Sequence, residues 1–200
     1  MKLRNIFAAA AVIILTLTAL MLLPAVYTTK DRIDTRAVPA QYAVSSDTSI
    51  EAQKEGQCAA YAAAYVLRSL GKEADTTALI ARIRRIFVFV TPGSVAALLR
   101  DYGCDAKAYH GDIAALKAHV SQGTPVIVFM RIPNDTHYAV VTGYDEEYLY
   151  LADPMPDNAN ADGAGYNRRI ATEEFEALWK TPTLLSENVY IAVIQNAERQ

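Results

Sequence analysis

The chain has 200 residues, of which 52% are hydrophobic and 9% aromatic, enough to bury one substantial core. Removing Lys2, Arg4 and Lys30 leaves 16 basic residues against all 22 acidic ones, so residues 31–200 carry a net charge of −6. This balance lacks the positive field that nucleic-acid binding needs, so no nucleic acid is expected as a partner.

An uncharged run from Ile6 to Tyr27 follows the first two basic residues. It is long enough to cross a bilayer as a helix, and longer than the core of a usual cleaved signal. We expect residues 1–29 to be a signal anchor that holds an extracytoplasmic domain at the membrane. The alternatives are a cleaved signal peptide, which would give a secreted domain, and a buried core helix.

Residues 30–49 are polar and show no helical period, so they are interpreted as a stalk, a linker or an early extended segment. The folded domain is then expected over residues 50–200.

Four helices are expected in the first half of this domain. The nine residues after Cys58 are only Ala, Tyr, Val and Leu, and a helix that is apolar on all sides is normally buried on all sides. Gly71 can close this helix in a left-handed cap. Capping residues and terminal glycines predict the other helices over residues 75–87, 91–103 and 112–123.

The second half changes in character. Segments rich in β-branched and aromatic residues predict a short strand at 104–109 and further strands at 124–132, 137–144, 147–154 and 189–195. Helices followed by an antiparallel sheet make an α+β fold.

The predicted hairpin over residues 137–153 brings two titratable residues together. If its turn is centred on Asp145, His137 lies directly opposite Asp153, with Cβ atoms about 5 Å apart. A hydrogen bond between imidazole and carboxylate fixes the tautomer of the ring and stabilises the imidazolium. The pairing depends on the register, because a slip of one residue would turn one side chain to the other face.

Cys58 lies at the start of the buried helix, where the helix dipole and a nearby imidazolium both favour a thiolate. Cys58, His137 and Asp153 are therefore the parts of a Cys-His-Asp hydrolase. Gln53 and the Cys58 backbone N–H are candidate oxyanion donors, with Gln57 as a competing one. This chemistry requires no cofactor and no metal.

The Gln53–Cys58 helix start, the segment HYAVVTGYDEEYLYLADP and the later ATEEFEALWK resemble the papain-like cysteine peptidases of the bacteriocin-processing, double-glycine-peptidase type. The resemblance covers about residues 45–195. It implies a papain-like fold and a peptide or protein substrate. It also implies that Cys58 is the nucleophile, His137 the base, Asp153 its orienter and Gln53 the oxyanion donor.

Two departures from that family keep other functions open. Ala59 stands where the family usually has glycine, and Gln53 lies five residues before the cysteine instead of the usual six. A catalytically silent peptide- or protein-binding domain is one alternative, and an acyl transferase that uses the same thiol is another. Nothing in the chain encodes a transporter domain.

Several stretches also allow other interpretations. Cys58 could form a disulfide with Cys104 or be an inert thiol, and Asp153 could merely end a strand. Residues 158–163 match the start of a calcium loop, but its acidic twelfth ligand is absent, so a flexible loop near the cleft is expected. Residues 82–90 are either a helix end that leads into a buried segment or an exposed docking patch. His110 and His119 are expected at the surface.

Overall fold

The computed structural model describes residue 7 and residues 11–16, 28–54, 56–86, 88–133, 135–180 and 186–194. The first elements are strands β1 (Thr29–Lys30) and β2 (Tyr42–Ala43), helices α2 (Cys58–Ser69), α3 (Thr76–Arg82) and α4 (Pro92–Asp101), strand β3 (Ala106–His110) and helix α5 (Ile113–Val120). Then come strands β4 (Val126–Ile132), β5 (Asp135–Tyr144) and β6 (Tyr148–Ala152), the 3₁₀ turn η1 (Pro156–Asn158), strand β7 (Arg168–Ala171), helix α6 (Thr172–Trp179) and strand β8 (Val189–Val193).

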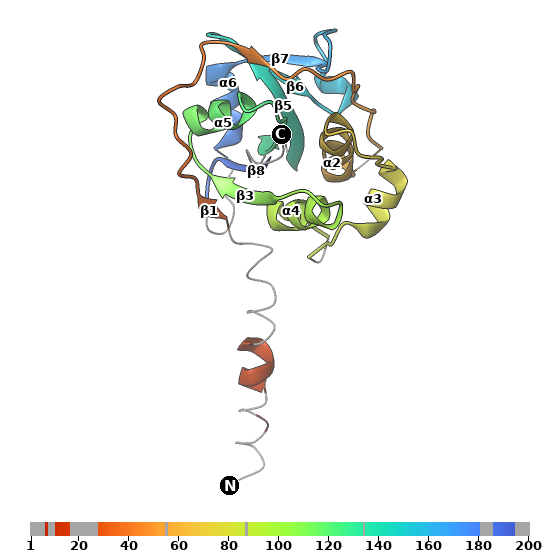
Figure 1. Ribbon diagram of the computed structural model, residues 1–200. Helices are drawn as coiled ribbons and strands as arrows, with labels where there is room; N and C mark the ends of the chain where they lie inside the picture. Colours follow the sequence, from red (N-terminus) through yellow and green to blue (C-terminus); the bar gives the residue numbers. More distant parts are fainter. Residues whose placement is uncertain are drawn as a thin grey trace.

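The strands form one sheet in the order β1-β3-β8-β4-β5-β6-β7, and β2 pairs with β5 outside this path. Strand β1 runs parallel to β3, whereas the other pairs are antiparallel. Helices α2, α3 and α4 pack on one face of the sheet, and α5 and α6 pack on the other (Figure 1). The expected α+β class is confirmed.

Successive residues of the central strands point to opposite faces, which gives the domain two apolar clusters. In β4, Ile127 packs with the α2 side, whereas Val126 and Val128 pack with the α5 and α6 side. Side chains of a strand alternate with a period of two residues, so a sheet that is covered on both faces buries both sets.

Helix α2 is the buried helix that its composition predicts. Every residue from Ala59 to Leu67 is buried. Gly71 has a φ of 70° and follows the last turn, where the Lys72 N–H donates to the Leu67 carbonyl at 3.0 Å. The left-handed conformation of Gly71 ends the helix, and the N–H groups that follow the last turn bond the free carbonyls of the helix end. The position of α2 across the core leaves its N-terminal residue, Cys58, half-buried at the edge.

The second predicted helix is shorter than expected, because α3 ends at Arg82. Beyond it, Ile86 and Phe89 form an isolated bridge, and the side chains of Val88 and Phe89 are 75% and 65% exposed. Of the two interpretations of residues 82–90, the structure thus supports an exposed apolar patch over a buried segment.

Strands β1 and β2 lie against the domain, and both fall in or next to residues 30–49, the segment interpreted as a stalk, a linker or an early extended segment. Strand β1 extends one edge of the sheet, and the Asp31 side chain behind it is 5% exposed. Strand β2 packs closely on β5 at Gly143, where a Cβ atom would come within 2.8 Å of the Tyr42 carbonyl oxygen. Two-residue strands carry too little pattern to be recognised in a sequence, so this packing was not predicted.

The predicted signal anchor, residues 1–29, falls mostly outside the described residues. Among those described, no helix is both long and apolar enough to cross a membrane.

The hairpin between β5 and β6 has a different register from the predicted one. Tyr144 pairs with Leu149 and Val140 with Ala152, and a bulge lies between these pairs. The turn is displaced because the Asp145 carboxylate, at its first position, accepts hydrogen bonds from the two N–H groups that close it. Asp153 therefore faces Ala139 instead of His137. The displacement is two residues at that point, so His137 and Asp153 stay on one face as diagonal neighbours.

Candidate active site

Cys58 is the first residue of α2, and the cap residue before it leaves the helix end open. Gln57 makes no side-chain hydrogen bond to the first turn. The N–H groups of a helix start have no partners within the helix, so without a side-chain cap they remain available to a ligand. The thiol thus lies beside backbone donors and at the positive end of the helix dipole.

The structure brings His137 and Asp153 into contact, although their strand register differs from the expected one. His137 Nε2 lies 2.7 Å from Asp153 Oδ1, and each residue is 1% exposed. Because an ionised carboxylate only accepts hydrogen bonds, Nε2 carries the proton. The other ring nitrogen, Nδ1, is then the one available to the Cys58 thiol, which lines the same cavity as the ring.

Four donors surround the Asp153 carboxylate. His137 and the Met155 N–H, at 2.9 Å, donate to Oδ1. Asn158 Nδ2 and Arg168 Nη1, both at 2.9 Å, donate to Oδ2. The carboxylate is therefore fully hydrogen bonded, and its orientation toward the imidazole is fixed from both sides.

A further side chain fixes the backbone of the same residue. The Asn167 amide accepts from the Asp153 N–H and donates to the Asp153 carbonyl, both at 2.8 Å. Sequence reasoning missed Asn167 and Arg168, because nothing in their spacing relates them to Asp153. The pairing of β7 with β6, in which Arg168 lies opposite Leu151, brings them there.

The positive charge of His137 and the negative charge of Asp153 stabilise each other. Burial disfavours a charged His137, but the hydrogen bonds with Asp153 and Cys58 outweigh it and raise the pKa of His137 to about 9. Burial also opposes ionisation of Asp153, yet His137, the Met155 N–H and Arg168 together hold the pKa of Asp153 below its usual value. At neutral pH the pair is therefore an imidazolium and a carboxylate.

Gln53 lies at the cleft beside the thiol. It lines a cavity of about 460 Å³ together with Cys58 and His137. Its backbone N–H donates to the Pro154 carbonyl at 2.7 Å, which ties it to the residue after Asp153. Its buried side-chain Oε1 has no hydrogen-bond partner in the described part of the chain. Gln57, the competing candidate, lines a different and much smaller cavity of about 10 Å³.

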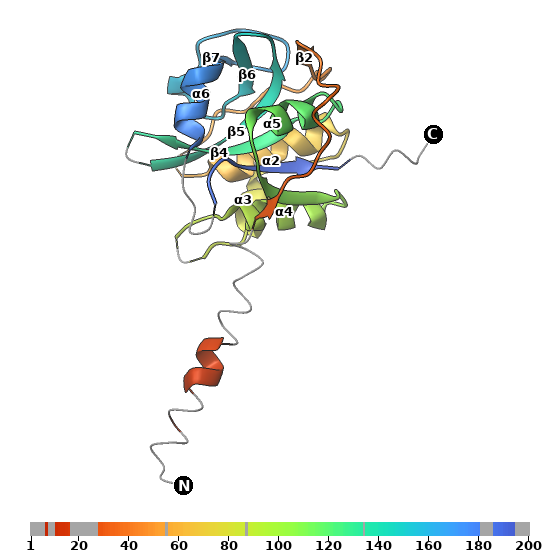
Figure 2. The same cartoon turned by 90° about the vertical axis from the view of Figure 1, so that its left-hand side faces the viewer.

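The rest of the cleft has both polar and apolar lining residues, the polar ones including Asp135 and Thr136. Val88 and Phe89 form one wall, and Ile132 and Met155 contribute further apolar surface. Ile132 lies at the end of the β4–β5 hairpin, which extends beyond the helices in Figure 2. The reactive groups thus lie in a cavity that is also lined by residues 88–90 and by the β4–β5 hairpin.

The structure also bears on the other interpretations of the two cysteines and of the loop at residues 158–163. Cys58 and Cys104 are both free thiols, so the expected alternative of a disulfide is wrong. Cys104 is a core residue, and burial raises the pKa of its thiol. In the possible calcium loop, Asn158 instead donates to Asp153. The described residues contain no group of three or more His, Cys, Asp or Glu side chains that could hold a metal ion.

Comparisons with known proteins give the family and several similar folds. A family model described as Peptidase_C39 like family matches residues 45–183. The fold is similar to a putative C39-like peptidase from Bacillus anthracis, with 18% identity, a TM-score of 0.63, and coverage of 79% of this chain and 99% of that one.

It is also similar to the peptidase domain of Streptococcus ComA, a bifunctional ABC transporter involved in a quorum sensing pathway. That match has 17% identity and a TM-score of 0.59, and it covers 74% of this chain and 98% of the other. A double glycine motif protease from an AMS/PCAT transporter, solved in complex with the leader peptide, matches with 19% identity, a TM-score of 0.51 and coverage of 72% and 88%. No curated protein matches the chain significantly.

Proposed function

The chain belongs to the Peptidase_C39 like family of cysteine-type peptidases, and on that premise we propose that it hydrolyses peptide bonds with Cys58 as the nucleophile. One observation carries the proposal: Cys58 and His137 line one cavity, and Nε2 of the His137 ring is 2.7 Å from a buried carboxylate. This is the arrangement of nucleophile, base and orienting group that acyl transfer requires.

In the proposed reaction His137 takes the thiol proton and holds Cys58 as a thiolate. The sulfur attacks the peptide carbonyl, and the oxyanion accepts hydrogen bonds from the Cys58 N–H and the Gln53 side chain. The imidazolium then protonates the leaving amine as the C–N bond breaks, which leaves a thioester on Cys58. Neutral His137 next takes a proton from water, whose oxygen attacks the thioester, and the acid product leaves as the thiol re-forms.

The expected substrate is a peptide or protein segment in extended conformation. Support comes from the cavity beside Cys58, whose lining includes Val88 and Phe89, and from the leader peptide bound by one of the similar proteases. These exposed apolar side chains favour substrates with bulky apolar residues near the scissile bond.

A mixed peptide library with mass-spectrometric detection tests the proposal. We expect cleavage by the wild-type chain, none by Cys58→Ser, and unchanged cleavage by Cys104→Ser, which alters the buried thiol only. Binding of peptides without any cleavage would support the silent binding domain instead. Products joined to an added amine, in place of free acids, would indicate an acyl transferase.

We propose further that the domain works outside the cytoplasm, tethered by its N-terminal segment. The uncharged sequence from Ile6 to Tyr27 behind two basic residues supports this location. Protease treatment of intact cells should then digest the domain. Survival outside followed by loss on lysis would place it in the cytoplasm.

A further inference from the structure

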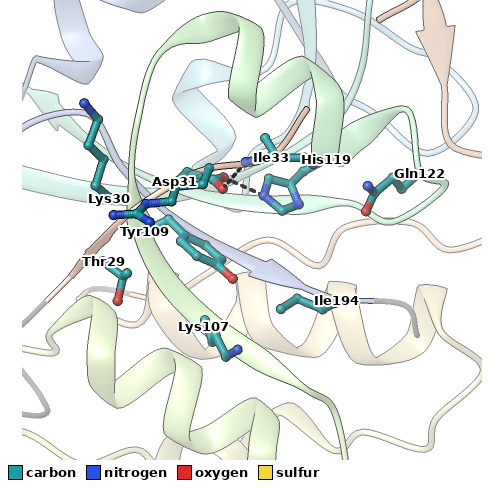
Figure 3. A pocket seen from close by; sticks show the side chains of 10 residues that line it. Thr29, Lys30, Asp31, Ile33, Lys107, Tyr109, His119, Gln122 and Ile194 are labelled. Carbon is teal, nitrogen blue, oxygen red and sulfur yellow. Dashed lines mark hydrogen bonds and ion pairs between the residues drawn. The ribbon is translucent and has the colours of Figure 1, made fainter. Parts of the chain in front are cut away.

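A second and larger cavity lies away from the cleft. It has a volume of about 760 Å³ and is formed by the residues of and after β1, by β3, by the end of α5 and by the end of β8 (Figure 3). It shares no lining residue with the cleft that holds Cys58. Its volume is in the range of cavities that bind small organic molecules.

A buried polar cluster forms one side of this cavity. Asp31 Oδ1 accepts from the Ile33 N–H at 2.9 Å, and Oδ2 accepts from His119 Nε2 at 2.6 Å and from the Tyr190 hydroxyl. Burial opposes ionisation of Asp31, but the bonds to Tyr190 and His119 keep its pKa below the usual value. The expectation that His119 lies at the surface is wrong, because this pairing leaves the residue only 6% exposed.

One atom of the cluster has no partner. Because ionised Asp31 accepts from Nε2, the remaining ring nitrogen of His119 is Nδ1, which is buried and makes no hydrogen bond to any described residue. The ring is held in place by Asp31 and by stacking on Tyr109, with centroids 5.6 Å apart. Figure 3 shows the edge of the ring opposite Asp31 turned toward Gln122 and Ile194, which line the cavity. A buried polar atom is costly when unpaired, and the cavity is where a partner can enter.

The surroundings indicate the charge of that partner. Lys30, Arg32 and Lys107 line the cavity and are exposed, and in the described part of the chain none of them forms an ion pair. The single lining carboxylate, Asp31, already accepts three hydrogen bonds. The uncompensated charge at the rim is therefore positive, whereas Ile33, Tyr109 and Ile194 add apolar surface.

We propose that this cavity binds a small organic carboxylate, whose oxygen is the hydrogen-bond partner of the buried His119 Nδ1 and whose apolar group packs on Tyr109 and Ile194. Lys30, Arg32 and Lys107 attract the anion from the rim. The site is separate from the peptidase cleft, so its existence does not depend on the proposed hydrolysis.

Titration of the full chain with benzoate tests the site, with benzamide as a neutral molecule of the same shape and at constant ionic strength. We expect saturable binding of benzoate, none of benzamide, and a shift of the His119 ring ¹⁵N signal. The ring signals are assigned by comparison with His110→Gln and His137→Gln proteins.

Exposed positions supply variants that do not disturb the buried cluster. Lys107→Gln and Arg32→Gln should each weaken benzoate binding by about fivefold, the effect of one nearby charge. Arg169→Gln removes one positive charge from β7, at the opposite edge of the sheet from β1, and should leave the affinity unchanged. The proposal is overturned if benzoate fails to saturate, if benzamide binds equally, if the two rim variants bind as wild type does, or if benzoate moves the His137 signal in place of that of His119.

Discussion

Replacing Asp153 with asparagine tests the role of the carboxylate in holding the base. The variant keeps the size of the side chain but removes a charge and an acceptor. Arg168 and Asn158 both donate to Oδ2, so the single amide oxygen should turn toward them. The amide NH₂ then faces His137, whose Nε2 must accept, which moves the ring proton to Nδ1 on the thiol side. The ring in that tautomer cannot take the proton of Cys58.

The size of the effect follows from the protonation of His137. The rise in its pKa from 6.5 to about 9 corresponds to about 3 kcal/mol in favour of the imidazolium. The hydrogen bond with Asp153 is the largest contribution that raises this pKa, so the variant loses most of that stabilisation. The equilibrium between the thiolate–imidazolium pair and the neutral pair should fall by about 10²-fold.

Alkylation with iodoacetamide near pH 7, followed by peptide mass spectrometry, measures this loss without a known substrate. The Cys58 rate should fall by about 10²-fold in Asp153→Asn, within the range that orienting carboxylates contribute elsewhere. Buried Cys104 is the internal reference, because its accessibility reports any unfolding. A Cys58 rate within about threefold of the wild-type rate, at equal Cys104 protection, would refute the assigned role of Asp153.

Three other predictions follow from the same contacts. Stabilisation by charged His137 is complete below pH 6.5 and is lost as the pH rises through about 9, so the melting temperature should fall over that interval, and less so in His137→Asn. Gln53→Ala should lower kcat for peptide cleavage by about 10²-fold without slowing Cys58 alkylation, whereas an equal loss in Gln57→Ala would move the oxyanion role to Gln57. Arg168→Gln leaves the buried Asp153 carboxylate without its guanidinium partner and should reduce the free energy of unfolding by about 3 kcal/mol; an unchanged urea midpoint would contradict this.

The helical half of the fold could be predicted from local chemistry. The all-apolar run after Cys58 required burial, and Asp112 caps α5 as expected by accepting from the Ala115 N–H at 2.8 Å. Such signals lie within a few residues of one another, so a single sequence contains them.

Contacts between distant segments could not be predicted in the same way. Arg168 reaches Asp153 only through the pairing of β7 with β6, and Asp31 buries His119 from 88 positions away in the chain. The bulge in β5 changed the hairpin register, yet the meeting of His137 with Asp153 was still anticipated, because the displacement at that point was even.

The central claim, that His137 makes Cys58 a nucleophile toward peptide carbonyls, is tested most directly by intact-mass analysis after treatment with a peptidyl electrophile such as a peptide fluoromethyl ketone. One adduct per chain is predicted, located on Cys58, absent from Cys104, and formed far more slowly in His137→Ala. Equal labelling in that variant, or no adduct on a folded wild-type chain, would contradict the account.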